Sequence, residues 1–205
     1  MWTPIYKIFE LFFPPFCLSC DERMDREEHL LCKSCYQNLN EFVEPFQLSP
    51  FYATCPIWDS VGPSQTLVTH LTQGKPYLVD AIAPFLIYRF YQLEIDPPKA
   101  ITFIPTKPHL KWSLGFCPRE LLAQTLSDLW GIPLQDCLSW ENDRLVLKKD
   151  PKENRIAVLE MDDEKLLQEA GSELDKRELI AFIVSTSSCG SRKPCPIPKG
   201  PLLQS

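Results

Sequence analysis

The stretch Leu179-Ile-Ala-Phe-Ile-Val184 consists of six apolar residues in a row. A run of this length, rich in β-branched and aromatic residues and too short for a helix, is typical of a strand buried on both faces of a parallel sheet. The run Ala100-Ile-Thr-Phe-Ile-Pro105 has the same character and ends at a proline, so we expect a central parallel strand there. Residues Ile156 to Leu159 predict a further strand.

Helical patterns lie before and between these strands. Ser64 is expected to cap a short helix, Tyr77 to Leu93 predicts a mostly buried helix kinked at its proline, and an amphipathic helix is expected from Pro118 to Gly131. Asp162 to Leu174 predicts an exposed helix with acidic residues in its first turn. The alternation of strand and helix after residue 100 predicts an α/β fold, with an open parallel sheet flanked by helices.

The composition limits the class of protein. The chain has 205 residues, 44% of them hydrophobic and 23% charged, which are ordinary values for one or two globular domains. The counts of 20 prolines and 7 glycines indicate short elements and leave little material for a glycine-rich phosphate loop. The net charge is −6, and residues 1–60 carry 4 basic and 9 acidic side chains, so a general electrostatic attraction for nucleic acid is not expected.

Four of the nine cysteines form two pairs, Cys17-Leu-Ser-Cys20 and Cys32-Lys-Ser-Cys35, with eleven residues between the pairs. Each pair predicts a tight turn whose two sulfur atoms point at one centre, and two such turns complete a tetrahedron of thiolates around Zn²⁺. Four protein ligands close the coordination shell, so the zinc is expected to be structural rather than catalytic. An iron–sulfur cluster and a chance arrangement of cysteines are the alternatives.

The chain is expected to divide into two parts. Residues 1–48 form a zinc-finger segment too small for a core of its own, and residues 57–205 form the larger domain, with Pro45, Pro50 and Pro56 marking a linker. No secretory signal opens the chain and no apolar stretch is long enough to span a bilayer, so we expect a soluble, cytoplasmic protein without a membrane span. The other five cysteines are expected to be buried or incidental thiols: Cys55, Cys117, Cys137, Cys189 and Cys195.

Taken together, these features resemble the ComF family, which are competence-associated proteins with a phosphoribosyltransferase-like domain. The resemblance covers about residues 8–190 and rests on a Phe-Pro-Pro-Phe-Cys-x-x-Cys finger, a strand ending in Pro105, a basic loop, the Gly115-Phe116 step and the helix after it. It implies a type I phosphoribosyltransferase fold. In that fold, residues 101–105 match the strand before the pyrophosphate loop and residues 179–184 match the strand before the diphosphoribose loop.

Three parts of the implied donor site are altered. Where the family has two adjacent acids followed by Thr-Thr-Gly-x-Thr, this chain reads Ser185-Thr-Ser-Ser-Cys-Gly190, so the carboxylates that would hold the ribose hydroxyls are missing. Leu114 and Cys117 stand where the resemblance places an arginine and an asparagine. A polar loop is expected over residues 106–113, and it contains two lysines. These lysines and the hydroxyl-rich loop could bind a phosphate weakly, or they could simply be solvated. The candidate phosphate-binding residues are Lys107, Lys111, Ser185, Thr186, Ser187, Ser188 and Gly190.

Three functions follow. The first is a ComF-like protein with a degraded diphosphoribose site, which acts in competence or DNA uptake through a protein partner of an uptake or recombination system. The second is a working phosphoribosyltransferase of nucleotide metabolism, which uses phosphoribosyl diphosphate with magnesium. The third is a zinc module that binds single-stranded nucleic acid, which the acidic surroundings of the finger disfavour. Beyond about Val184 the sequence becomes proline-rich, so we expect the end of the domain to be degenerate or truncated. This end is either native or the product of a frameshift.

Overall fold

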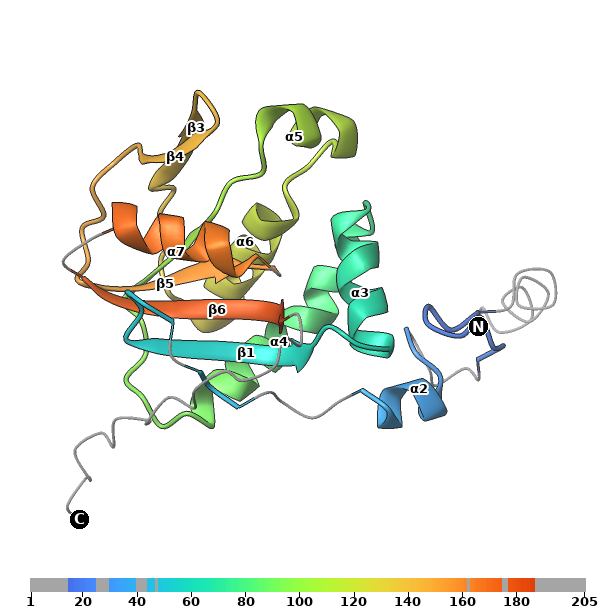
Figure 1. Cartoon of the computed structure of the whole chain (residues 1–205). Helices are drawn as coiled ribbons and strands as arrows, with labels where there is room; N and C mark the ends of the chain where they lie inside the picture. The colour runs from blue at the N-terminus through green and yellow to red at the C-terminus, as the bar shows by residue number, and fades with distance from the viewer. Residues whose placement is uncertain are drawn as a thin grey trace, which may run out of the picture.

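A four-stranded parallel sheet forms the centre of the molecule. The computed structural model describes residues 15–24, 30–39, 44–46, 48–161, 163–174 and 177–186. Neighbouring strands of the sheet are all parallel, in the order β1 (Ala53–Asp59), β6 (Glu178–Thr186), β5 (Arg155–Glu160) and β2 (Ala100–Phe103) (Figure 1). The predicted α/β class and the three predicted strands are thereby confirmed.

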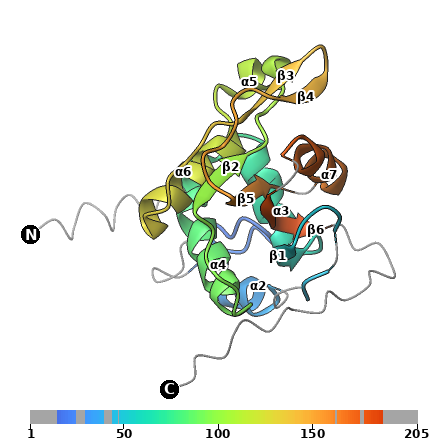
Figure 2. The ribbon, with the colours of Figure 1, turned by 90° about the vertical axis from the view of Figure 1, so that its left-hand side faces the viewer.

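Helices cover both faces of this sheet (Figure 2). One face carries α3 (Pro63–Thr72), the short 3-10 helix η1 (Pro76–Leu78), α4 (Val79–Tyr91) and α6 (Pro118–Trp130). The core on the other face is closed by α7 (Glu164–Glu173) and by the antiparallel hairpin of β3 (Leu138–Glu141) and β4 (Arg144–Leu147). Two short helices complete the described part: α2 (Lys33–Gln37) and α5 (Pro108–Leu114). None of the described helices is long and apolar enough to cross a membrane.

Successive residues of each strand point to opposite faces, which gives the sheet two apolar cores. On β6, Ile180 and Phe182 lie in the core under α3, α4 and α6, whereas Leu179 and Ala181 lie in the core under α7. Because both cores exclude water, the buried strand sequences are mostly apolar on both faces instead of alternating between apolar and polar residues.

The sequence predicts a central position for the strand at residues 100–105, but β2 lies at an edge of the sheet. The residues of β2 are buried because the segment after α6 covers its outer side. Ile101 N donates to Pro133 O, and Gln135 N donates to Ile101 O. An edge strand that is covered in this way has the same apolar sequence as a central strand. The predicted central position of residues 100–105 was therefore wrong.

The opposite edge strand, β1, corrects the predicted linker. Pro56 lies inside β1, level with Ile183 of β6, instead of in a connection. An edge strand tolerates a proline because the missing N–H can face away from the neighbouring strand. Residues 53–56 therefore belong to the sheet, although in the sequence Pro56 indicates a break.

Two local predictions about helices were also wrong. The sequence predicts a polar loop over residues 106–113, but α5 occupies most of it, starting at Pro108 and ending before Gly115, whose φ is 78°. Ser64 does not cap α3. Its hydroxyl donates to two carbonyl groups of the preceding turn, and Gly62 occupies the cap position.

A buried ion pair joins α6 to the end of β5. Glu160 is fully buried, and its Oε1 atom accepts hydrogen bonds from Arg119 Nε at 2.7 Å and from the backbone N–H of Met161 at 2.9 Å. The Arg119 side chain is only 17% exposed. Because a carboxylate in an apolar core is costly unless it is paired, this contact fixes the first turn of α6 against the carboxyl end of β5.

We expect Glu160→Ala to lower the free energy of unfolding by about 3 kcal/mol or more, because it removes the carboxylate that pairs with the largely buried Arg119 guanidinium. The matched control is Asp136→Ala, which removes an exposed ion pair with Lys148 and should cost much less, because solvent screens exposed charges. Denaturant unfolding of the two variants measures both losses. Equal losses would contradict the structural role of Glu160.

Candidate metal centre

The first cysteine pair lies in a tight turn. A short antiparallel bridge closes residues 16–23, and within it Cys17 N donates to Glu22 O while Asp21 N donates to Cys17 O. Asp21 has a φ of 57°, a left-handed conformation that aspartate adopts more readily than most residues. This turn carries both Cys17 and Cys20, which are separated by two residues.

The second cysteine pair lies at the start of α2. Cys32 occupies the N-cap of this five-residue helix, and its sulfur accepts a hydrogen bond from the backbone N–H of Cys35 at 3.4 Å. Leu18 N donates to Leu30 O, which ties the second pair to the first turn. The same two-residue spacing therefore comes from a turn in one pair and from a helix start in the other.

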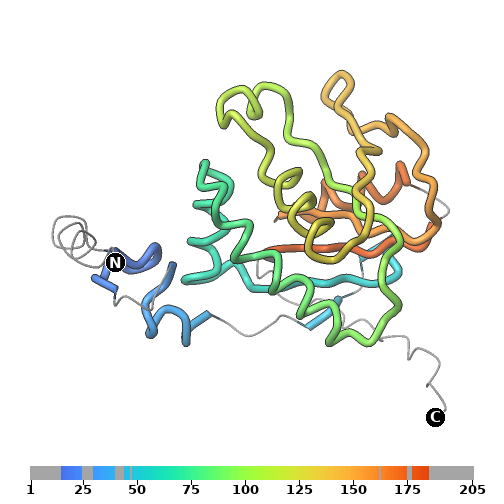
Figure 3. Tube along the Cα trace, turned by 180° about the vertical axis from the view of Figure 1, so that it is seen from behind, coloured from blue at the N-terminus to red at the C-terminus, as the bar shows by residue number. Residues whose placement is uncertain are grey.

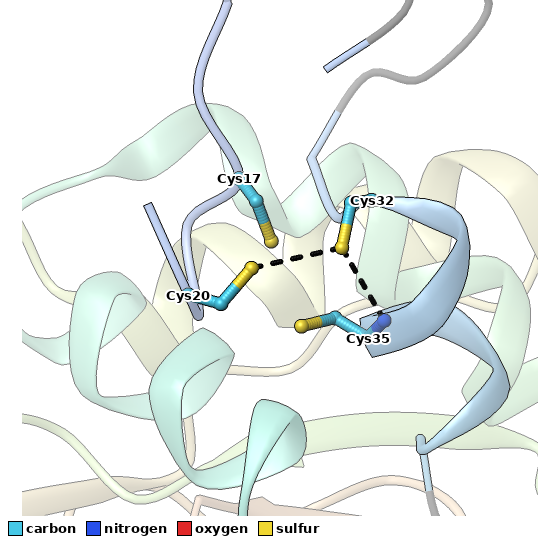
Figure 4. A group of neighbouring side chains, drawn as sticks. All are labelled: Cys17, Cys20, Cys32 and Cys35. Carbon is cyan, nitrogen blue, oxygen red and sulfur yellow. Dashed lines mark hydrogen bonds between the residues drawn. The ribbon is translucent and has the colours of Figure 1, made fainter. Parts of the chain in front are cut away.

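The four sulfur atoms converge on one point (Figure 4). They all lie within 4.8 Å of one another, and Cys20 Sγ is 3.6 Å from Cys32 Sγ. Tetrahedral zinc with Zn–S bonds of about 2.3 Å requires sulfur atoms about 3.8 Å apart, whereas a disulfide requires about 2.05 Å. The described cysteines are all free thiols, and the four predicted ligands could hold a metal ion such as zinc.

The electrostatics of the cluster favour a bound cation. Burial and the neighbouring thiols raise the pKa of Cys35 to about 12. Burial also opposes ionisation of Cys17, but backbone hydrogen bonds from its neighbours outweigh it and lower the pKa of this thiol to about 7. Four thiolates at this distance repel one another, so a divalent cation that replaces their protons supplies the missing charge. With four protein ligands the shell is closed, and the chemistry available to such an ion is structural.

The two lysines predicted to bind phosphate follow β2 at the carboxyl edge of the sheet, and both are paired with carboxylates. Lys107 Nζ is 3.1 Å from Asp143 Oδ1 and 4.9 Å from the centre of the Trp140 ring. Lys111 Nζ is 3.0 Å from Glu120 Oε2, and the hydrogen bond and charge of this carboxylate raise the pKa of Lys111. A phosphate at either lysine would compete with a carboxylate already in place, so phosphate binding stays a prediction.

The hydroxyl-rich loop begins at the same edge. Ser185 and Thr186 are the last two residues of β6. The structure thus places only the start of the predicted phosphate loop. The other predicted loop residues, two thiols and the histidine between the cysteine pairs lie outside the described residues: Ser187, Ser188, Gly190, Cys189, Cys195 and His29.

Three of the remaining thiols are buried, as the sequence predicts. Cys55, Cys117 and Cys137 are each at most 3% exposed. Burial raises the pKa of Cys55 to about 12, which makes this thiol inert. The Cys117 sulfur accepts a hydrogen bond from the Thr106 hydroxyl at 3.1 Å and caps α6, so it serves the fold.

Two contacts near these sites escape sequence reasoning. His70 Nε2 of α3 lies 3.3 Å from Leu18 O in the first cysteine turn, and the Arg119–Glu160 pair joins residues 41 positions apart. The signal available in the sequence is a single acid, Glu160, directly after an apolar strand. Nothing in the sequence indicates the partner of His70.

No family model, no curated protein and no solved structure matches this chain. The site is therefore interpreted from its own contacts and distances.

We expect the purified chain to hold one zinc ion, with an affinity that falls as the pH falls, because protons compete with the metal for the thiolates. Since the pKa of Cys35 is raised to about 12, zinc binding at neutral pH should release protons, which calorimetry in buffers of different ionisation enthalpy measures.

The matched variants are Cys35→Ser, which should abolish tight zinc binding, and Cys55→Ser, which removes a thiol of the sheet and should leave one zinc per chain. Iron and sulfide in the purified protein, or full zinc retention by the first variant, would argue against the zinc centre.

Proposed function

We propose that this chain is a ComF-like protein, in which a structural zinc finger is joined to a type I phosphoribosyltransferase-like domain whose donor site no longer works. In this proposal the protein acts in competence or DNA uptake through contacts with a protein partner. The observation that carries the proposal is the end of β6, because the sequence over residues 185–190 that follows its apolar run contains no acidic pair.

The position of β6 explains why this exchange matters. In open α/β sheets, ligands bind outside the carboxyl ends of the strands, and β6 is one of the two inner strands here. Carboxylates accept strong hydrogen bonds from ribose hydroxyls and are the usual protein ligands of magnesium, whereas serine and threonine hydroxyls supply no negative charge. The neighbouring carboxylate at this edge, Glu160 of β5, is already bonded to Arg119.

The charge near the edge also disfavours a polyanionic donor. Lys107 and Lys111 are paired with Asp143 and Glu120, and each pair would have to break to bind a phosphate. The loss of one charged hydrogen bond costs about 1.5–3 kcal/mol, so the loss of several weakens donor binding by orders of magnitude. In a protein that does not bind the phosphoribosyl donor, the α/β domain would serve as a scaffold for contacts with a protein partner.

We expect no binding of phosphoribosyl diphosphate, with magnesium present, at millimolar concentration in a calorimetric titration of the zinc-loaded full chain. The double variant Lys107→Ala/Lys111→Ala is the control, since both side chains are exposed enough for removal without unfolding. Micromolar binding that this double variant abolishes would establish a working donor site and overturn the proposal.

The role in DNA uptake has its own test in cells that take up DNA and normally carry this protein. We expect deletion of the chain to reduce the number of transformants, and the Lys107→Ala/Lys111→Ala variant to restore it, because the proposed role uses no phosphate chemistry. Unchanged transformation after deletion would exclude the uptake role. Failure of the double variant to restore transformation, with normal protein levels, would favour the enzyme.

A further inference from the structure

The cysteine finger and the sheet domain share one apolar core. Three of the four metal-binding cysteines are buried in the same contiguous cluster as α3 and the sheet, together with Met24 and Leu31: Cys17, Cys32 and Cys35. From α3, Leu67, Val68 and Leu71 belong to this cluster. The finger is therefore packed against the domain instead of being suspended from it by a linker (Figures 1 and 3).

A specific hydrogen bond strengthens this packing at the metal site. His70, in the last turn of α3, places Nε2 3.3 Å from the carbonyl oxygen of Leu18, where its N–H donates. Leu18 lies between the ligands Cys17 and Cys20, so the contact holds the turn that carries the first cysteine pair.

The described part of the finger contains little regular structure that could maintain this turn. Its described residues contain a five-residue helix and one isolated bridge, both too short to be stable alone in water. The turn is thus held from two sides, by the metal on one and by α3 on the other. Two interactions that require the same conformation stabilise each other.

We infer that the finger is a metal-dependent clamp on the sheet domain, so that zinc binding and the stability of the α/β core are thermodynamically coupled through His70. A ligand that binds only the folded state stabilises everything that unfolds with its site. The coupling is reciprocal, because α3 also raises the affinity of the finger for zinc. The coupling rests on the zinc finger of the proposed function, but not on the state of the donor site or on a role in DNA uptake.

The first test uses tryptophan fluorescence, because residues 15–39 contain no tryptophan and Trp58, Trp112, Trp130 and Trp140 all lie in the sheet domain. Trp2→Phe removes the one tryptophan outside it. On thermal unfolding of this full-length variant, chelation of zinc should lower the midpoint by at least about 5 °C, or abolish the folded signal. An unchanged midpoint after complete zinc removal, verified by metal analysis, would overturn the inference.

The second test addresses His70 directly and does not depend on the stability of a metal-free chain. In competition with a chromogenic chelator, His70→Ala should lose zinc affinity by about fivefold, the effect of one hydrogen bond, although it changes no ligand. Thr69→Ala, an exposed neighbour on the same helix, should bind zinc as the unmodified chain does. His70→Gln, which keeps a donor, should recover part of the loss. Equal affinities for the alanine variants at positions 69 and 70 would refute the coupling.

Discussion

The close approach of four cysteine sulfur atoms, which can all ionise only if a cation offsets the repulsion among the thiolates, is the constraint on which the described N-terminal finger depends. Sulfur atoms within 4.8 Å of one another carry stable negative charge only around a cation. The described residues of the segment that holds them contain one short helix, and its buried apolar side chains, Met24 and Leu31, belong to the same core as α3. A metal ion held by these four cysteines, together with α3 of the sheet domain, would stabilise this segment as a larger hydrophobic core does in other small domains.

The sheet domain depends on a different condition, the exclusion of water from both faces of four parallel strands. Helices α3, α4 and α6 meet one face, and α7 with the β3–β4 hairpin meets the other. At the carboxyl edge, Arg119 is paired with Glu160, and Lys107 and Lys111 are paired with carboxylates. These ion pairs neutralise the charges that would otherwise be available to a sugar-phosphate ligand. In our proposal, the side chains at this edge stabilise the fold, whereas in a transferase the same edge would bind the donor. The protein then acts through contacts with a protein partner.

Sequence reasoning was most successful where a local pattern determines the structure. The six apolar residues 179–184 predict β6, and the two Cys-x-x-Cys pairs predict a cluster of four thiols, because spacing alone brings the sulfurs of each pair together. It failed where a distant segment decides. Pro56 indicates a break, because the sequence does not show that this residue lies in an edge strand, β1. The apolar sequence of β2 predicts a central strand, because residues 133–135 cover the outer side of this edge strand. His70 and Arg119 gained their roles from partners 52 and 41 residues away.

The central claim is that four thiolates hold a structural metal ion that joins the finger to the sheet domain. X-ray absorption at the zinc edge of the purified full-length chain tests it most directly, because it reports the number and type of ligand atoms around the ion. The account predicts four sulfur neighbours at about 2.3 Å and no lighter ligand. A shell with oxygen or nitrogen in place of any sulfur, or a protein that carries no zinc, would contradict it.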